Sequence, residues 1–349
     1  MKIKIYILLL IHIFIASCNS TDKKEGDYEK IYHINKIDLS RELLRPSLFC
    51  IIDSVVVLHD NVTSKDALFF AFNLSTGDEY AKFGIIGSGP FDYNYPVQMN
   101  YNSKDKKIWV FDRNYSKLYG YNLYDIINNQ IDSILQIKIP SEASRVVLEN
   151  ESSGYCLGNF LTDGMIGKII NGKITKTFGY FPEIKDDKLT STQKFGLFQG
   201  DIKINQNKIV YTSARCDLIK IFHILKDSLI EVKTQYSYLP KYIQGNDNYL
   251  TLLPENPNGY ISVSVSNNYI LALFSGRNKK EYEDRHYFGD IIHIFNWEGE
   301  IIKKVILNKD AWQIFFNENT NKLYTVHFNL DESEDDTNVQ YYEYDLKII

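Results

Sequence analysis

The sequence predicts an all-β fold, a six-bladed β-propeller of four-stranded antiparallel blades whose ring is closed by an N-terminal strand. Three observations support this prediction. Tyr (26) and Phe (20) are abundant while Met (3) is scarce, which favours strands over helices. Alternating aromatic residues followed by Asn or Asp recur along the chain. Two pairs of these recurrences are each 49 residues apart, close to the length that a four-stranded blade needs.

The clearest copy of the repeat is residues 107–123. Two strand-like segments, 108–111 and 117–122, flank a polar turn that contains Arg113, as expected of a β-hairpin. Similar endings close residues 70–74, 119–123, 293–297 and 342–346, so that Leu74 and Leu123, and likewise Trp297 and Leu346, are 49 residues apart.

From these repeats the chain divides into six blades, at residues 46–84, 96–139, 144–179, 197–234, 259–306 and 311–345. The sixth blade contains only three strands of its own, and we expect residues 29–39 to supply the fourth. This pairing would close the ring and remove its free strand edges. A pair of β-sandwiches or an open solenoid is the alternative fold, and five or seven blades are the alternative counts. A sandwich needs no period near 50 residues, and a solenoid needs distinct capping ends.

The first residues carry an export signal. Lys2 and Lys4 precede an apolar run at 5–15, and Ile-Ala-Ser-Cys then ends at Cys18. This ending resembles a bacterial lipobox, which implies that Cys18 becomes the lipid-modified first residue and attaches the protein to a membrane. A plain secretory signal and an uncleaved anchor are the alternatives. We expect a lipoprotein signal peptide at 1–17, a lipid-anchored tether at 18–27 and the propeller domain at 28–349.

Charge and cysteine content exclude several classes of protein. Without Lys2 and Lys4, 37 basic residues remain against 44 acidic ones, a net charge of −7, and there is no basic run that predicts a nucleic-acid partner. Cys50, Cys156 and Cys216 are an odd set, so at most one disulfide is expected and no disulfide framework. Cys50 and Cys156 lie in apolar, strand-like surroundings, where a buried and inert thiol is expected. No Cys-x-x-Cys motif occurs, and we expect neither a metal site nor a cofactor.

Residues 83–93 (Phe-Gly-Ile-Ile-Gly-Ser-Gly-Pro-Phe-Asp-Tyr), together with 270–277, 289–299 and 344–346, resemble a family of TolB-like six-bladed propeller lipoproteins of Bacteroidetes. The resemblance covers nearly the whole mature chain. It implies a propeller fold and an outer-membrane address, and the side of that membrane, periplasmic or cell-surface, stays open. It implies no settled activity.

The Gly-rich motif within 83–93 also has a local interpretation. Gly87 and Gly89 allow positive φ and Pro90 fixes φ, so the segment, which ends at Tyr93, is expected to steer the outermost strand of one blade to the innermost strand of the next. The alternative is that the glycines present backbone N–H groups to an anion. We favour the structural interpretation, because no helix follows the motif and no Lys lies at Walker spacing.

Three arginines occupy equivalent turns. Arg113, Arg215 and Arg277 lie in the predicted turn between the second and third strands of blades two, four and five. In a four-stranded meander these turns share one face of the ring, so we predict that the three guanidiniums lie near the axis and clamp a carboxylate or phosphate. The alternative is that each Arg pairs with a neighbouring acid. Polar insertions at 278–288 and 331–336 extend the same face. The second is acidic but lacks the spacing of a Ca²⁺ loop.

Signatures of known enzymes are missing from the sequence. It has no Gly-x-Ser-x-Gly elbow and no His-Glu-x-x-His motif. We therefore interpret the chain as a non-enzymatic binding module for a peptide, glycan or protein partner. The alternative is a hydrolase or lyase that acts on glycans in the central channel. Converging acids in a deep pocket would favour the enzyme, and a broad rim of aromatic residues and loops would favour the binding module.

Overall fold

The computed structural model describes residues 28–61, 67–131, 133–162, 164–184, 188–245, 250–328 and 339–348. The expected signal peptide at 1–17, the tether at 18–27 with Cys18, and the acidic run at 331–336 lie outside these residues.

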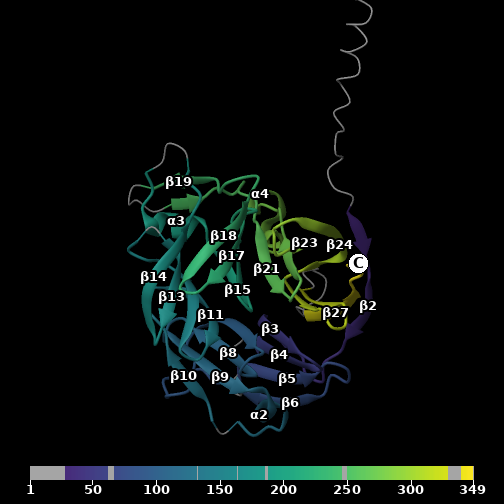
Figure 1. Ribbon diagram of the computed structural model, residues 1–349. Coiled ribbons are helices and arrows are strands. Elements are labelled where there is room, and N and C mark those ends of the chain that lie inside the picture. Colours follow the sequence, from purple (N-terminus) through teal and green to yellow (C-terminus); the bar gives the residue numbers. More distant parts are fainter. Residues whose placement is uncertain are drawn as a thin grey trace, which may run out of the picture.

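Six antiparallel sheets stand around a common axis, each with its first strand innermost, which confirms the predicted six-bladed β-propeller (Figure 1). Blade one consists of β3 (Pro46–Ile52), β4 (Val55–Asp60), β5 (Phe69–Asn73) and β6 (Glu79–Phe83). Blade two consists of β7 (Pro96–Asn102), β8 (Lys107–Asp112), β9 (Lys117–Asn122) and β10 (Leu135–Lys138). Blade three consists of β11 (Ala143–Asn150), β12 (Ser153–Gly158), β13 (Gly164–Ile170) and β14 (Lys173–Tyr180).

The second half of the ring repeats this order. Blade four consists of β15 (Gly200–Asn205), β16 (Lys208–Ser213), β17 (Ile219–Leu225) and β18 (Ser228–Gln235). Blade five consists of β21 (Tyr260–Val265), β22 (Tyr269–Phe274), β23 (Gly289–Asn296) and β24 (Ile301–Ala311). Blade six takes β25 (Gln313–Asn317), β26 (Lys322–Phe328) and β27 (Val339–Asp345) from the end of the chain.

The N-terminal segment closes the ring, as predicted, but in two steps. β2 (His33–Ile37) pairs antiparallel with β27, with His33 opposite Tyr344, and so becomes the fourth strand of blade six. Before it, β1 (Glu29–Ile31) pairs in parallel with β24 and adds a fifth strand to blade five. The predicted single strand is therefore shared between two blades. Together, β1 and β2 cover the outer edges of β24 and β27.

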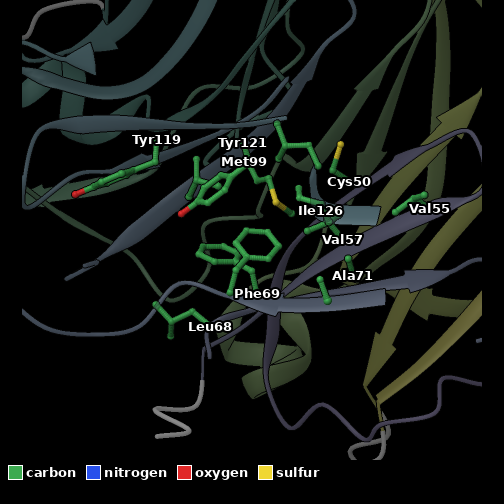
Figure 2. Close-up of a cluster of buried hydrophobic side chains, with 14 of the residues drawn as sticks. Cys50, Val55, Val57, Leu68, Phe69, Ala71, Met99, Tyr119, Tyr121 and Ile126 are labelled. Atoms are coloured by element: carbon green, nitrogen blue, oxygen red, sulfur yellow. The ribbon is translucent and has the colours of Figure 1, made fainter. Parts of the chain in front are cut away.

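The core lies between neighbouring blades, where the buried faces of the sheets pack against each other. Figure 2 shows part of one such cluster, with Phe69 from β5 and Met99 from β7 close to Tyr119 and Tyr121 from β9. The ring of Phe69 stacks on Phe83 at 5.3 Å between centroids. The hydroxyls of Tyr93 and Tyr121 are hydrogen-bonded at 2.7 Å, so these two buried tyrosines are not left with unpaired polar atoms.

The three cysteines of the described chain are free and buried. Burial raises the pKa of the Cys50 and Cys156 thiols to about 12, and that of Cys216 to about 11. Because the thiolate is the reactive form, these side chains are expected to be inert. No disulfide forms within the described residues. This agrees with the interpretation of the sequence.

One face of the ring carries most of the added structure. We call it the mouth face, defined by the links between blades and the turns between second and third strands. It bears α3 (Ser191–Leu197), the hairpin of β19 (Tyr242–Gln244) and β20 (Leu250–Leu252), and α4 (Lys279–Tyr282) with the short 3₁₀ helix η1 (Glu283–Tyr287). The hairpin was not predicted. Helix α2 (Leu123–Ile127) follows a third strand and therefore lies on the opposite face.

Candidate functional site

The three predicted arginines all lie in turns of the mouth face. Arg113 lies between β8 and β9, Arg215 between β16 and β17, and Arg277 between β22 and β23. The residue that ends the second strand, or follows it, fixes each turn. Asp112 is fully buried and accepts hydrogen bonds from the backbone N–H groups of residues 94, 95 and 115. Ser213 and Ser275 accept from the N–H groups of Arg215 and Arg277.

The centre of the ring is a cavity of about 880 Å³. Its wall is formed mainly by the innermost strands of all six blades, together with parts of the mouth-face turns. A cavity of this size is in the range of small-molecule binding sites. Five of its lining residues are basic, Lys104, Arg113, Arg145, Lys203 and Arg215, and two are acidic, Glu149 and Asp201. The cavity is therefore cationic, although the protein as a whole is acidic.

Arg113 and Arg215 both line this cavity. Within the described part of the chain, no carboxylate lies at ion-pairing distance from either guanidinium. Arg215 donates to the neutral amide oxygen of Gln199 at 3.3 Å, and its buried Nε has no hydrogen-bond partner. These two cations are thus left without a fixed counter-charge at the entrance of the channel.

Arg277 is held differently. It is not among the lining residues, and it donates to both carboxylate oxygens of Asp310, at 2.6 and 2.7 Å. Asp290 lies 3.3 Å away, and the guanidinium stacks over the ring of Tyr282. Burial by itself would raise the pKa of Asp310, but the hydrogen bonds and charge of Arg277 outweigh it and leave the pKa lowered. The structure thus places two of the three arginines in the lining of the channel, and the third is paired with an acid.

Sequence reasoning missed a polar network inside the channel. Asp201 is the centre of this network, with the side-chain nitrogens of Lys203, Gln98 and Arg145 at 3.2, 3.3 and 4.0 Å from its oxygens. Gln98 also accepts from the backbone N–H of Val146 at 2.6 Å. The network joins blades two, three and four across the inner edge of blade three.

A recurrent backbone irregularity explains why the network was missed. The innermost strands of blades one, two, three and five each have a register shift near their start, of the kind that a β-bulge produces. The residue after the shift is Gln98 in blade two and Arg145 in blade three. A bulge redirects the side chains that follow it, so simple alternation in the sequence assigns them to the wrong face. The sequence signal that could have indicated these channel residues was a polar or charged residue within an otherwise apolar, strand-like segment.

The Gly-rich motif has a structural role, but not through the predicted backbone angles. Neither Gly87 nor Gly89 has positive φ, whereas Gly84 does, at 70°. The two glycines are needed for space, because an added Cβ would lie 2.1 Å and 2.8 Å from a carboxylate oxygen of Asp92. That carboxylate accepts from the N–H of Gly89 at 2.7 Å.

The rest of the motif is tied into the blade. The N–H of Gly87 donates to the carbonyl of Tyr93, and the side chain of Gln136 donates to the carbonyl of Pro90. The N–H groups of both glycines are thus already hydrogen-bonded within the loop, as the structural interpretation of the motif expects. The loop presents no open anion-binding nest at these two positions.

A serine and a histidine meet at the channel wall. The Oγ of Ser47, a lining residue, lies 2.6 Å from Nδ1 of His59. Burial lowers the pKa of His59 to about 4, and its Nε2 is buried without a hydrogen-bond partner. A histidine with so low a pKa is a weak general base, and a third group that would orient it is missing at Nε2. The pair therefore resembles a packed core contact more than an activated nucleophile.

Among the described residues, no group of three or more His, Cys, Asp or Glu side chains is placed to hold a metal ion. Across the same residues, no helix combines the length and the apolar character needed to cross a membrane.

Comparison with known proteins identifies the fold independently. A family model described as TolB-like 6-blade propeller-like matches residues 44–319. A solved structure of a protein of Bacteroides fragilis, described as exported, is similar with a TM-score of 0.54 and 10% identity, covering 88% of this chain and 94% of that one. A member of the DUF4221 family from Bacteroides vulgatus is similar with a TM-score of 0.53 and 14% identity, covering 91% and 96%.

No curated protein sequence matches the chain. The two structural similarities are at low identity and bear on the fold alone. The family match covers most of the chain and agrees with the six blades seen in the structure. The chain belongs to the TolB-like six-bladed propeller family.

Proposed function

We propose that the protein is a lipid-anchored, extracytoplasmic binding module that holds an anionic group of a peptide, glycan or protein partner in its central channel. One observation carries the proposal. Five cationic and two anionic side chains line a cavity of about 880 Å³, and two of the cations, Arg113 and Arg215, have no carboxylate partner in the described chain. Confined cations with low-dielectric walls focus the field onto an incoming anion.

The two acids of the cavity reduce the excess of positive charge but do not remove it. Glu149 forms an ion pair with Lys168, which does not line the cavity. Asp201 contacts Lys203 and Arg145 and leaves the guanidiniums of Arg113 and Arg215 uncompensated. An anion that enters from the mouth face therefore meets these two guanidiniums first.

The arrangement favours binding over glycan hydrolysis or lysis. Retaining and inverting glycosidases need two carboxyl groups that face each other across the scissile bond. Asp201 lies near the start of β15, at the mouth face, and Glu149 lies near the end of β11, at the opposite face. The two carboxylates therefore belong to opposite ends of the channel. The Arg113 and Arg215 pair fits the recognition of an anion more closely than it fits acid–base chemistry.

An extracytoplasmic location is supported by the export signal. The anchor is tested by the variant Cys18→Ala. We expect wild type to incorporate a radiolabelled fatty acid and Cys18→Ala to incorporate none. Absence of the label from wild type would contradict the lipid anchor.

Binding is tested with the unlipidated mature chain, residues 19–349, on glycan and peptide arrays at two salt concentrations. We expect acidic probes to bind, with the signal falling as salt rises because the interaction is between charges. The double variant Arg113→Ala, Arg215→Ala should lose this signal, and Lys138→Ala, which removes an exposed charge from the outermost strand β10, should retain it. Salt-independent binding of neutral probes that survives the double variant would contradict the proposal.

A further inference from the structure

The charge of the channel wall is confined to one half of the ring. All seven charged lining residues belong to blades two, three and four, and they are Lys104, Arg113, Arg145, Glu149, Asp201, Lys203 and Arg215. Among the described lining residues, blades five, six and one contribute none. A ligand that carried only negative charge would be matched by one half of the wall and left without partners on the other.

The neutral half presents aromatic rings at the mouth. Tyr287, at the end of η1, and Trp312, just before β25, both line the cavity, with their ring centroids 6.4 Å apart in an edge-to-face arrangement. Trp312 is held from behind by Phe288 and Phe328, at 5.6 and 6.0 Å between ring centroids. Tyr287 is 44% exposed. The two rings therefore form a supported surface that faces an open space.

The remainder of the neutral half mixes apolar side chains, among them Ile261 and Phe315, with polar ones. Ser262 and Ser264 lie on β21 and accept from the backbone N–H groups of Ile314 and Phe316 on β25. Gln313 lines the same wall and donates to the carbonyl of Ser47. A purely apolar ligand would be poorly matched to hydroxyls and amides at this density. The neutral half suits a molecule with both C–H faces and hydroxyl groups.

Resting on the proposed function, we propose that the ligand of the channel is an acidic saccharide, a sugar ring that carries a carboxylate. Its carboxylate would lie against the guanidinium of Arg113 or of Arg215, and a ring face would lie on the exposed ring of Tyr287, beside Trp312. Guanidiniums match carboxylates in planar geometry, and aromatic side chains bury large apolar area while tolerating polar neighbours. A polyphosphate would use the cationic half and leave the aromatic rings without a partner.

The proposal is tested by isothermal titration calorimetry on residues 19–349 with three probes. Trigalacturonate carries sugar rings and carboxylates, its methyl ester carries the same rings without the charge, and citrate carries carboxylates without rings. The variants are the double variant Arg113→Ala, Arg215→Ala, the single variant Tyr287→Ala, and Lys138→Ala as the matched control for loss of a cation outside the channel. Circular dichroism and thermal melting of each variant show whether it is folded.

We expect trigalacturonate to bind more tightly than citrate and the methyl ester to bind at least about tenfold more weakly, since a charged hydrogen bond is lost. The arginine double variant should weaken both acidic probes. Tyr287→Ala should weaken trigalacturonate alone, and Lys138→Ala should change neither.

Two outcomes overturn the inference, and they are distinguishable. Equal affinity for citrate and trigalacturonate, or an unchanged trigalacturonate affinity in folded Tyr287→Ala, removes the saccharide while leaving anion binding in the channel standing. Failure of every acidic probe to bind, or binding that is unchanged in the arginine double variant, removes the saccharide and the proposed function together.

Discussion

Replacing Arg277 by Met should destabilise the fold through Asp310. The change keeps much of the side-chain volume and removes a guanidinium that donates to both carboxylate oxygens, at 2.6 and 2.7 Å. The side chain of Arg277 is 14% exposed and that of Asp310 is 35% exposed, so the pair lies between a surface and a buried ion pair. Exposed pairs contribute about 0–1 kcal/mol and breaking buried pairs costs about 3–5 kcal/mol, so we expect a loss of about 2 kcal/mol.

This loss should be measured by urea denaturation near neutral pH and by thermal melting. Unfolding entropy of about 2.1 cal/mol/K per residue over about 320 residues gives about 0.7 kcal/mol/K, so 2 kcal/mol corresponds to a fall in Tm of about 3 °C. The control is Arg113→Met in the equivalent turn of blade two. Because no hydrogen bond or ion pair of its guanidinium falls within the described structure, its change should stay within about 0.5 kcal/mol.

The pH dependence provides a second readout. The pKa of Asp310 is lowered in the folded state, so its contribution is present above the unfolded pKa of about 3.9 and is lost as the pH falls through the lower folded value. The stability difference between wild type and Arg277→Met should therefore shrink towards zero in acid. A double-mutant cycle with Asp310→Asn should give a coupling energy of at least about 1 kcal/mol. Additive effects, or a difference that persists unchanged at low pH, would refute this account of Arg277.

Three other predictions follow from the fold. Deleting residues 28–37 uncovers the edge of β27 and removes the buried Ile37, so we expect size-exclusion chromatography to show aggregation or loss of the folded monomer; an unaltered monomer would contradict closure by β2. Gly87→Ala places a Cβ 2.1 Å from a carboxylate oxygen of Asp92, so Tm should fall, whereas Gly196→Ala, with open space around it inside α3, should leave Tm unchanged or raise it slightly. The buried thiols of Cys50, Cys156 and Cys216 should resist Ellman's reagent in the native state and react after denaturation. Fast labelling of the native protein would contradict their burial.

The architecture could be predicted from the sequence because each blade repeats the same short sequence pattern. Aromatic alternation followed by Asn or Asp marks the ends of strands, and the 49-residue spacing sets the size of a blade. The orphan segment before blade one predicted closure because the sixth blade was short of a strand. The parallel pairing of β1 with β24 was not predictable, because the paired residues are more than 270 positions apart and no local hairpin signal connects the two strands.

The candidate site was only partly predictable, for two physical reasons. The turns that carry Arg113 and Arg215 were placed correctly on one face, but the partner that binds Arg277 is Asp310, 33 residues away at the end of a long strand. Local sequence carries no sign of that contact. Inside the channel, bulges at the start of the innermost strands change which side chains face inward. The sequence pattern therefore did not predict that Arg145 lines the channel.

The Gly-rich motif at residues 83–93 shows a similar limit of local sequence. Gly87 and Gly89 suggested unusual backbone angles, and the structure shows instead that a carboxylate of Asp92 occupies the space beside them. The chemistry of a glycine is ambiguous in sequence because it permits both positive φ and close approach. Only the position of its neighbour distinguishes the two.

The claim on which the account depends is that the channel wall of blades two to four attracts an anion. A crystal of residues 19–349 soaked in bromide tests it most directly, because anomalous scattering marks each bound bromide by position. We predict a strong peak inside the channel, in contact with the guanidinium of Arg113, Arg145 or Arg215. A channel without bromide, while exposed lysines elsewhere on the surface bind it, would contradict the claim.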